Sequence, residues 1–234
     1  MVDRTFLFEV LRKLGFEETF INYIKTFYEK ANSKVFINNE FGENIYLKMG
    51  VRQGCPLSMY LYILFIDPFL KFIKKKINST QISQSNHQIS AFVDDIAIFI
   101  QNLTDIGQLE NCIEIFEKAT NSKVNRTKSY LLKLGAWKTE TQWPVTWITS
   151  QESIKMLGIH WYEDILTTID KNCTKIIEKM EKSIINTFNR LLTIQQKVIF
   201  FNSFIVTKFS QIAKILPIPK THTDKIQQLG HHFI

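Results

Sequence analysis

The chain is poor in cysteine, and this scarcity excludes two kinds of structure. It holds three cysteines in 234 residues, Cys55, Cys112 and Cys173, and no two of them form a Cys-x-x-Cys pair. The five histidines do not cluster with them. An odd, widely spaced set of thiols argues against a disulfide framework and a structural zinc site, and it fits a reducing compartment.

The chain also lacks an uninterrupted apolar segment long enough to cross a membrane. Such a segment needs about 18 apolar residues, and the longest candidate, which starts at Leu57, is interrupted by Asp67 and the run Lys74–Lys76. The first residues, Met1 to Arg4, do not resemble a secretory signal. We therefore expect an intracellular protein, nuclear or cytoplasmic, with no membrane partner.

The charge is unbalanced towards basic residues. The net charge is +7, and the lysines are spread along the chain rather than gathered in one run. With 45% hydrophobic residues the chain can bury a core, as one large or two small domains. A basic globular protein of this kind suits a polyanionic partner such as a nucleic acid.

Glycine and proline are scarce, with eight and five copies, but two glycines and a proline lie within residues 50–56. Gly50-Val51-Arg52-Gln53-Gly54-Cys55-Pro56-Leu57-Ser58 predicts a loop in which the backbone can approach a ligand closely. Its arginine and glutamine offer donors for phosphates or base edges. A long apolar segment at helical spacing follows this loop.

A second stretch carries two adjacent carboxylates. Asp94 and Asp95 lie between the apolar runs Phe92-Val93 and Ile96–Ile100, which predicts a β-hairpin with both aspartates at its turn. Neighbouring carboxylates repel each other, and hard cations such as Mg²⁺ favour their oxygen atoms. A metal site and a solvated surface turn are both consistent with this stretch taken alone.

The loop, the helix after it and the aspartate hairpin together resemble the reverse transcriptases of non-LTR (long-interspersed-element-type) retrotransposons. The run Arg-Gln-Gly-Cys-Pro-Leu-Ser matches the second palm motif of that family, and Phe92-Val93-Asp94-Asp95 matches its aromatic-x-Asp-Asp motif. Group II intron reverse transcriptases share both motifs and are the nearest alternative. Where the family usually has proline after the serine, this chain has Met59.

The resemblance implies roles for particular residues. Asp94 would be the main Mg²⁺ ligand of a two-ion site and Asp95 a weaker or structural one. Arg52, Gln53 and Gly54 would position the template base and the incoming deoxynucleoside triphosphate. The implied partners are an RNA template and a DNA primer, whereas the oligomeric state stays open.

Two later segments resemble further motifs of the family. Asn125, Lys128 and Ser129 match its next palm motif, which makes Lys128 a nucleotide- or template-binding candidate; a basic surface turn is the alternative. Leu157 and Gly158 match the hairpin that grips the primer end, with Met156 where tyrosine is common.

The expected fold class is α+β. The resemblance implies a partial right-hand polymerase palm with an antiparallel sheet and part of the fingers over residues 1–162, and an incomplete all-helical thumb over 163–234. Four lysines of the thumb fall near one helical face: Lys171, Lys175, Lys179 and Lys182. This face either is solvated or contacts the phosphates of a nucleic acid. Tryptophans 137, 143 and 147 cluster around Pro144.

Periodicity and breaker residues predict the individual elements. We expect two helices over 5–30 with a break at Gly15-Phe16, a hairpin of 35–37 with 45–47, a helix over 57–77, a polar loop over 78–87, a helix capped by Thr104-Asp105 and running to Thr120, a strand over 130–134, a hairpin over 154–161, and helices over 169–192, 194–215 and from 221 onwards.

The resemblance also predicts what this chain does not contain. The first palm motif of the family carries a further metal-binding aspartate, and Asp3 matches a position downstream of it. We therefore interpret the chain as a reverse transcriptase truncated at both ends and expect it to be inactive as a polymerase by itself. A non-catalytic nucleic-acid-binding remnant is the alternative function, and a remnant without function is a third possibility.

Overall fold

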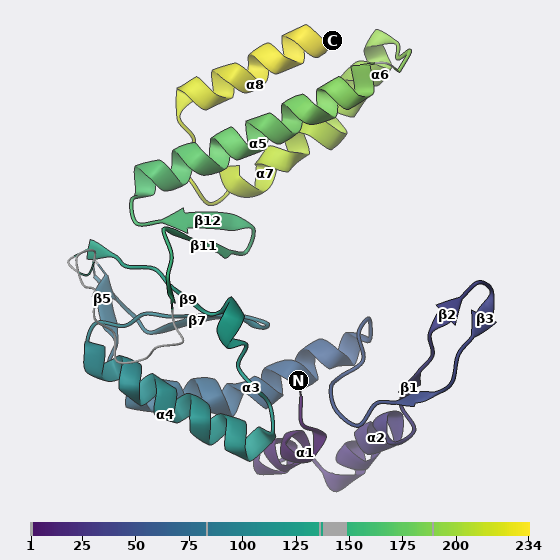
Figure 1. Cartoon of the computed structure of the whole chain (residues 1–234), viewed down its shortest axis with the longest axis vertical. Helices are drawn as coiled ribbons and strands as arrows, with labels where there is room; N and C mark the ends of the chain where they lie inside the picture. Colours follow the sequence, from purple (N-terminus) through teal and green to yellow (C-terminus); the bar gives the residue numbers. More distant parts are fainter. Residues whose placement is uncertain (1, 83, 136, 138–148, 189) are drawn as a thin grey trace. The chain divides into compact units, whose positions relative to one another are not determined.

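The computed structural model describes residues 2–82, 84–135, 137, 149–188 and 190–234 (Figure 1). Trp143, Pro144 and Trp147 of the expected tryptophan cluster lie outside these ranges. The chain folds as two compact units, which divide the described residues after Lys128. Each unit has its own hydrophobic core. The expected division between palm and thumb near residue 163 stays a prediction.

Four helices form the core of the first unit. They are α1 (Arg4–Lys13), α2 (Glu18–Glu29), α3 (Pro56–Lys76) and α4 (Leu103–Thr120). The break between α1 and α2 falls at Gly15, which has a φ of +86°, as the sequence predicts. Aromatic side chains join the helices: Phe69 of α3 stacks on Phe116 of α4 with ring centroids 4.5 Å apart, and Phe65 meets Phe116 edge to face.

Helix α3 is long and apolar enough to cross a membrane by length and composition. Its contacts give another reason for this composition. Leu61, Phe65, Phe69 and Ile73 are all buried in the core of the first unit, against α1 and α4. Helix α3 therefore buries one apolar face in the core, while 33% of its apolar window is buried in all.

The strands of the first unit form hairpins. Strand β1 (Asn32–Ser33) pairs with β4 (Ile45–Tyr46), β2 (Phe36–Ile37) with β3 (Glu40–Phe41), β5 (Thr80–Ile82) with β6 (Ser85–His87), and β7 (Ile89–Phe92) with β8 (Asp95–Ile98). All four pairs are antiparallel. In Figure 1 the β2–β3 hairpin lies at the tip of an arm that leaves the helices beside α2.

Three expectations about the first unit are wrong in detail. The arm pairs Phe36 with Phe41 across a tight turn, because Asn38 and Asn39 both take positive φ values of 50° and 65°. The polar stretch over 78–87 contains the β5–β6 hairpin rather than only a loop. Helix α4 has Asn102 at its N-cap, and Asp105 is instead buried within the first turn.

The second unit packs helices around α5 (Ile165–Phe188). The chain continues through α6 (Ile194–Phe200), a π-helix labelled η3 (Phe201–Val206), α7 (Thr207–Ala213) and α8 (Lys220–Phe233). Figure 1 shows α7 and α8 alongside α5, and both contact it. The sequence predicts a helix across 194–215, but apolar spacing does not reveal the π-helical turn within it.

Short strands accompany these helices. Strand β9 (Tyr130–Leu131) is shorter than predicted and pairs in parallel with β10 (Thr149–Ser150). The expected hairpin of the second unit is confirmed: β11 (Ser153–Met156) pairs with β12 (Ile159–Tyr162) in antiparallel register. The described residues thus mix helices with small two-stranded sheets, which confirms the expected α+β class at this coarse level.

Candidate active site

The two aspartates lie at the end of the β7–β8 hairpin. Asp94 is in the turn, whereas Asp95 is the first residue of β8, paired with Phe92. The expectation of a hairpin is confirmed, and the expectation that both aspartates occupy the turn is wrong for Asp95. Both side chains are exposed, so their oxygens are accessible to a cation or a substrate.

The other turn residue, Val93, has a φ of +54°. A β-branched residue in this left-handed region is an outlier, because its side chain crowds the backbone. Such strain costs about 1–3 kcal/mol and is concentrated at functional sites. The sequence does not predict this positive φ at Val93, since asparagine or glycine is the usual residue in such a conformation.

Helix α3 directly follows the glycine-containing loop, and one of its residues interacts electrostatically with the aspartate turn. Tyr62, two turns into α3, is half-buried, and burial raises the pKa of its phenol. The negative charge of Asp94 raises this pKa further, so the carboxylate and the phenol are electrostatically coupled. The helix itself begins at Pro56, directly after the loop. The loop and the aspartate turn therefore belong to the same compact unit.

The loop before α3 exposes its candidate binding residues. Arg52, Gln53 and Gly54 are all exposed. Gly50 and Gly54 have φ values of +87° and +81°, and a Cβ atom at Gly54 would have no atom within 4 Å. Backbone conformation, rather than lack of space, therefore requires glycine at position 54.

Arg4 holds the start of this loop, and the sequence analysis missed this role. Its guanidinium donates to the carbonyl oxygens of Gly50 at 3.1 Å, Tyr28 at 3.1 Å and Met49 at 3.4 Å. It also lies over the Tyr28 ring, 4.8 Å from the centroid. Burial lowers the pKa of Arg4. No sequence pattern signals these contacts, since an arginine near the first helix has no special spacing from residue 50.

Cys55 is the N-cap of α3. Hydrogen bonds from the backbone of Leu57, and more weakly from Ser58, lower the pKa of its thiol. The nearby positive charge of Arg52 acts in the same direction. The start of α3 therefore favours the negatively charged form of this thiol.

Lys128 lies at the end of the first unit, in a 3-10 turn over Arg126–Lys128. Its neighbour Arg126 forms ion pairs with Glu110 at 3.0 Å and Glu117 at 3.2 Å, both on α4. These carboxylates raise the pKa of Arg126. Arg126 thereby anchors the turn, while Lys128 is exposed and has no ion pair within the described part of the chain.

Leu157 and Gly158 form the turn of the β11–β12 hairpin in the second unit. Their φ values are 50° and 85°. Gln211 of α7 donates from Nε2 to the carbonyl oxygen of Leu157 at 2.8 Å, which fixes the turn against the helices. These two residues therefore belong to a different compact unit from the aspartates, the loop and Lys128.

The donor set fits part of a magnesium site. Asp94 and Asp95 supply two exposed carboxylates on adjacent residues, and Mg²⁺ commonly takes one or two carboxylates together with water and substrate phosphates. Among the described residues, no three histidine, cysteine, aspartate or glutamate side chains gather as a possible metal site. The two carboxylates thus suit part of such a site, and no third acid gathers beside them among the described residues.

Comparison with known proteins identifies the class of this site. Residues 1–161 match the family model of the reverse transcriptase (RNA-dependent DNA polymerase), and this match includes the loop, the aspartate turn and Lys128. The chain belongs to the reverse transcriptase family.

Two curated relatives show to which group of reverse transcriptases the chain is similar. It is 34% identical over 163 residues to the transposon TX1 uncharacterized 149 kDa protein of Xenopus laevis, covering 68% of this chain. It is 24% identical over 124 residues to the retrovirus-related Pol polyprotein from type-2 retrotransposable element R2DM of Drosophila melanogaster, covering 53% of this chain. Both are non-LTR retrotransposon proteins, which confirms the predicted family. The chain spans 12% of the length of each relative.

Proposed function

We propose that this chain is the RNA-directed DNA polymerase domain of a non-LTR retrotransposon protein and acts by two-metal nucleotidyl transfer. The observation that carries the proposal is the pair Asp94 and Asp95, exposed at a strained turn beside the helix that follows the Arg52–Gly54 loop. The substrates would be an RNA template, a DNA primer and deoxynucleoside triphosphates, in an intracellular setting, nuclear or cytoplasmic.

Each residue has a role in this reaction. Bound Mg²⁺ ions would activate the primer 3′-hydroxyl and stabilise the leaving pyrophosphate. Asp94 would be the principal ligand and Asp95 the weaker one. Gln53 and the backbone at Gly54 would contact the template base and the nucleotide, because such contacts tolerate any sequence. Arg4 would act as a positioning residue through its hydrogen bonds to the backbone at Met49 and Gly50.

This proposal assigns each of the two compact units to a part of a right-hand polymerase. The first would supply palm and part of the fingers, and the helices of the second would form the thumb. Leu157 and Gly158 would hold the primer end, because their turn is fixed to α7 by Gln211. Lys128 would contact the nucleotide or the template.

Metal binding can be tested in the chain itself. Fe²⁺ that occupies a Mg²⁺ site, with ascorbate and peroxide, generates radicals that cut the backbone next to the ligands. We expect a cut near Asp94 that excess Mg²⁺ suppresses and that Asp94→Asn removes. The matched control is Asp67→Asn, since Asp67 lies on α3 and pairs with Lys71 at 2.7 Å. Cleavage that persists in Asp94→Asn would contradict the assignment.

Polymerase activity is a separate measurement. Because the described residues contain no third acid beside the aspartate pair, we expect the 234-residue chain not to extend an oligo(dT) primer on poly(rA) with Mg²⁺. If this chain extends the primer and Asp94→Asn does not, polymerase activity is confirmed. The expectation that the metal site is incomplete is then wrong.

A second function is favoured by the lysines of α5. Lys171, Lys175, Lys179 and Lys182, here called the lysine stripe, are all exposed and have no carboxylate partner among the described residues. The alternative is a non-catalytic nucleic-acid-binding protein. It predicts binding of a primer–template whose affinity falls steeply with salt, with no metal-dependent cleavage near Asp94. Binding that is insensitive to salt would exclude it.

A further inference from the structure

Phe204 is an exposed aromatic residue whose position is fixed. It belongs to the π-helix η3, in which its neighbours Phe201 and Ile205 are buried, whereas 60% of Phe204 is exposed. π-Helical turns inside helices are rare and are frequent at functional sites. An exposed phenyl ring in a helical segment of this kind calls for a physical explanation.

One face of the Phe204 ring is covered, and this leaves the other face available. Phe200 stacks on it with ring centroids 5.2 Å apart and an interplanar angle of 29°. Phe200 is itself half-buried and contacts Phe233 of α8, with centroids 6.0 Å apart. The Phe204 ring is thus supported from behind by two further rings, which is the arrangement of a stacking platform.

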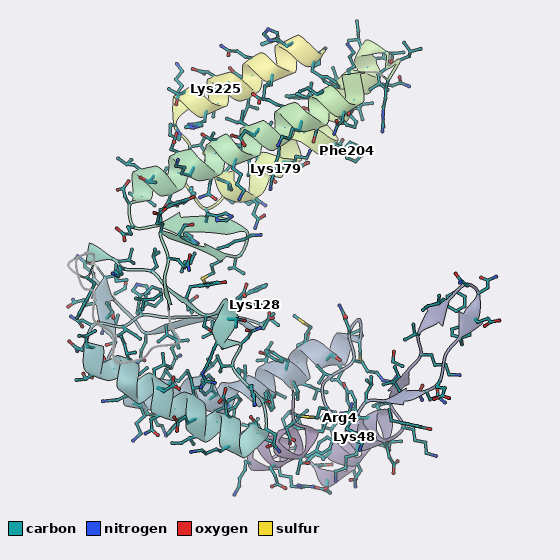
Figure 2. All side chains as sticks on the ribbon, in the orientation of Figure 1. Arg4, Lys48, Lys128, Lys179, Phe204 and Lys225 are labelled. Carbon is teal, nitrogen blue, oxygen red and sulfur yellow. The ribbon has the colours of Figure 1, made fainter. Side chains whose placement is uncertain are left out.

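The platform lies beside positive charge. Lys208, one turn after Phe204, donates from Nζ to the hydroxyl oxygen of Ser183 on α5. Ser183 directly follows Lys182 and is one turn beyond Lys179. In Figure 2, Lys179 of α5 and Phe204 of η3 both lie on the side of α5 opposite α8.

The charge around Phe204 is almost entirely of one sign. Residues 194–213, which form α6, η3 and α7, contain no aspartate or glutamate. On α5, Glu178 borders the lysine stripe and Glu181 lies further round the helix. The stripe extends about 10 Å from Lys175 to Lys182 at the α-helical rise, which is long enough to meet successive phosphates of one strand.

We propose that Phe204 stacks on an unpaired base of a nucleic-acid strand whose phosphates contact the lysine stripe and Lys208. A supported aromatic face beside a row of cations is the combination that binds single strands without sequence preference. In a paired duplex the base faces are already covered by neighbouring bases, so the second unit would hold a single-stranded segment. This inference rests on the proposed function, since it assumes a nucleic-acid substrate.

The test uses the full chain and a short single-stranded oligonucleotide that carries one 2-aminopurine. In Phe204→Leu we expect affinity to fall about 5- to 150-fold, the range measured for loss of one base–aromatic stack. The quenching of 2-aminopurine on binding is also lost, and Phe204→Trp restores both. Leu166→Ala is the control, since Leu166 is an exposed apolar residue on the other side of α5.

Salt dependence separates stacking from charge. Lys208→Gln should reduce the slope of log affinity against log salt by about 0.7, as expected for one lost phosphate contact to a single strand. Phe204→Leu should leave that slope unchanged. An unchanged affinity in Phe204→Leu, or an equal loss for a fully paired duplex, would overturn the inference.

The same measurements distinguish two failures. If the wild-type chain binds a primer–template but Phe204→Leu binds the single strand as well as wild type, only the stacking role fails. If the wild-type chain binds neither nucleic acid, the proposed function fails together with this inference.

Discussion

The chain contains two hairpins of equal length whose turns differ in backbone conformation. β7–β8 and β11–β12 each pair four residues of one strand with four of the other, and each closes through a two-residue turn. The second turn uses Leu157 and Gly158, while the first uses Val93 and Asp94 at the position of the candidate metal ligands. Both turns have a non-glycine residue at positive φ in their first position, Val93 at 54° and Leu157 at 50°. They differ in the second position, where Gly158 takes a φ of 85° that suits glycine, whereas Asp94 has no positive φ.

The two hairpins also differ in how side chains hold them. Asn172, buried on α5, clamps β12: it accepts from the backbone N–H of His160 at 2.9 Å and donates to its carbonyl oxygen at 2.6 Å. Near β7, Gln88 donates to carbonyl oxygens at the end of α3, including Lys74 at 2.9 Å. The β11–β12 hairpin is therefore fixed along its strand, whereas the aspartate turn projects from its hairpin with exposed carboxylates.

Removing the hydrogen bonds of Asn172 should change the free energy of unfolding more than any other change to the two hairpins. We expect Asn172→Ala to lower the free energy of unfolding by about 2–4 kcal/mol, because two backbone groups of His160 and the carbonyl of Thr168 lose a buried partner. Urea denaturation followed by circular dichroism measures this. The control is Asn186→Ala, at an exposed position of the same helix. An equal loss of stability in both variants would contradict the stabilising role of the Asn172 hydrogen bonds.

The glycine turn should be the next most sensitive position. Gly158→Ala is expected to cost about 1–2 kcal/mol, because alanine disfavours a φ of +85° and its Cβ would lie 3.1 Å from Nε2 of Gln211. The same urea experiment measures it. Gly107→Ala is the matched control: Gly107 lies in α4 with no atom within 4 Å of a Cβ, so that change should stabilise the helix slightly.

Relieving the strain in the aspartate turn should have the opposite sign. We expect Val93→Asn to raise the free energy of unfolding by about 0.5–1 kcal/mol, because asparagine tolerates a left-handed backbone far better than valine. A shift of the urea midpoint to higher concentration checks this. A destabilised Val93→Asn would show that packing of the valine side chain outweighs the backbone strain.

The smallest expected effect concerns pH. Burial first, and then the charges of Lys175, Lys155 and Lys179, lower the pKa of His160 in the folded chain. The unfolded chain therefore binds more protons as the pH falls through about 6.5, so stability is present above that pH and is lost below it. We expect His160→Gln to show a smaller fall of the urea midpoint between neutral and mildly acidic pH. An identical fall in both proteins would exclude His160 as the cause.

Sequence reasoning predicted most helices correctly and placed strands less well. The bounds of α3 lie within one residue of prediction, because a long apolar segment is flanked by Pro56 and a lysine run. The β5–β6 hairpin was missed because its residues are almost all polar and carry no alternation. The actual register of the arm depends on two asparagines in left-handed conformation, which the pattern of apolar residues does not specify.

The same division applies to the candidate site. Sequence motifs identified Asp94, Asp95 and the Arg52–Gly54 loop because the family's chemistry requires particular residue types at fixed spacing. They did not identify Arg4, because its partners are backbone carbonyl oxygens. Every residue has such an oxygen, so these hydrogen bonds require no particular residue type at the acceptor positions. They also did not identify the platform of Phe204, since an exposed and a buried phenylalanine look alike at helical spacing.

The sequence by itself determined the family and most of the helices, because these depend on residue type and on local spacing. Only the tertiary structure decided which groups hold the loop, which residues of the turns take a positive φ, and which phenylalanine is exposed to solvent. These properties depend on contacts between residues far apart in the chain, such as Gln211 with Leu157. Such contacts form only when the helices of each unit pack together into its core.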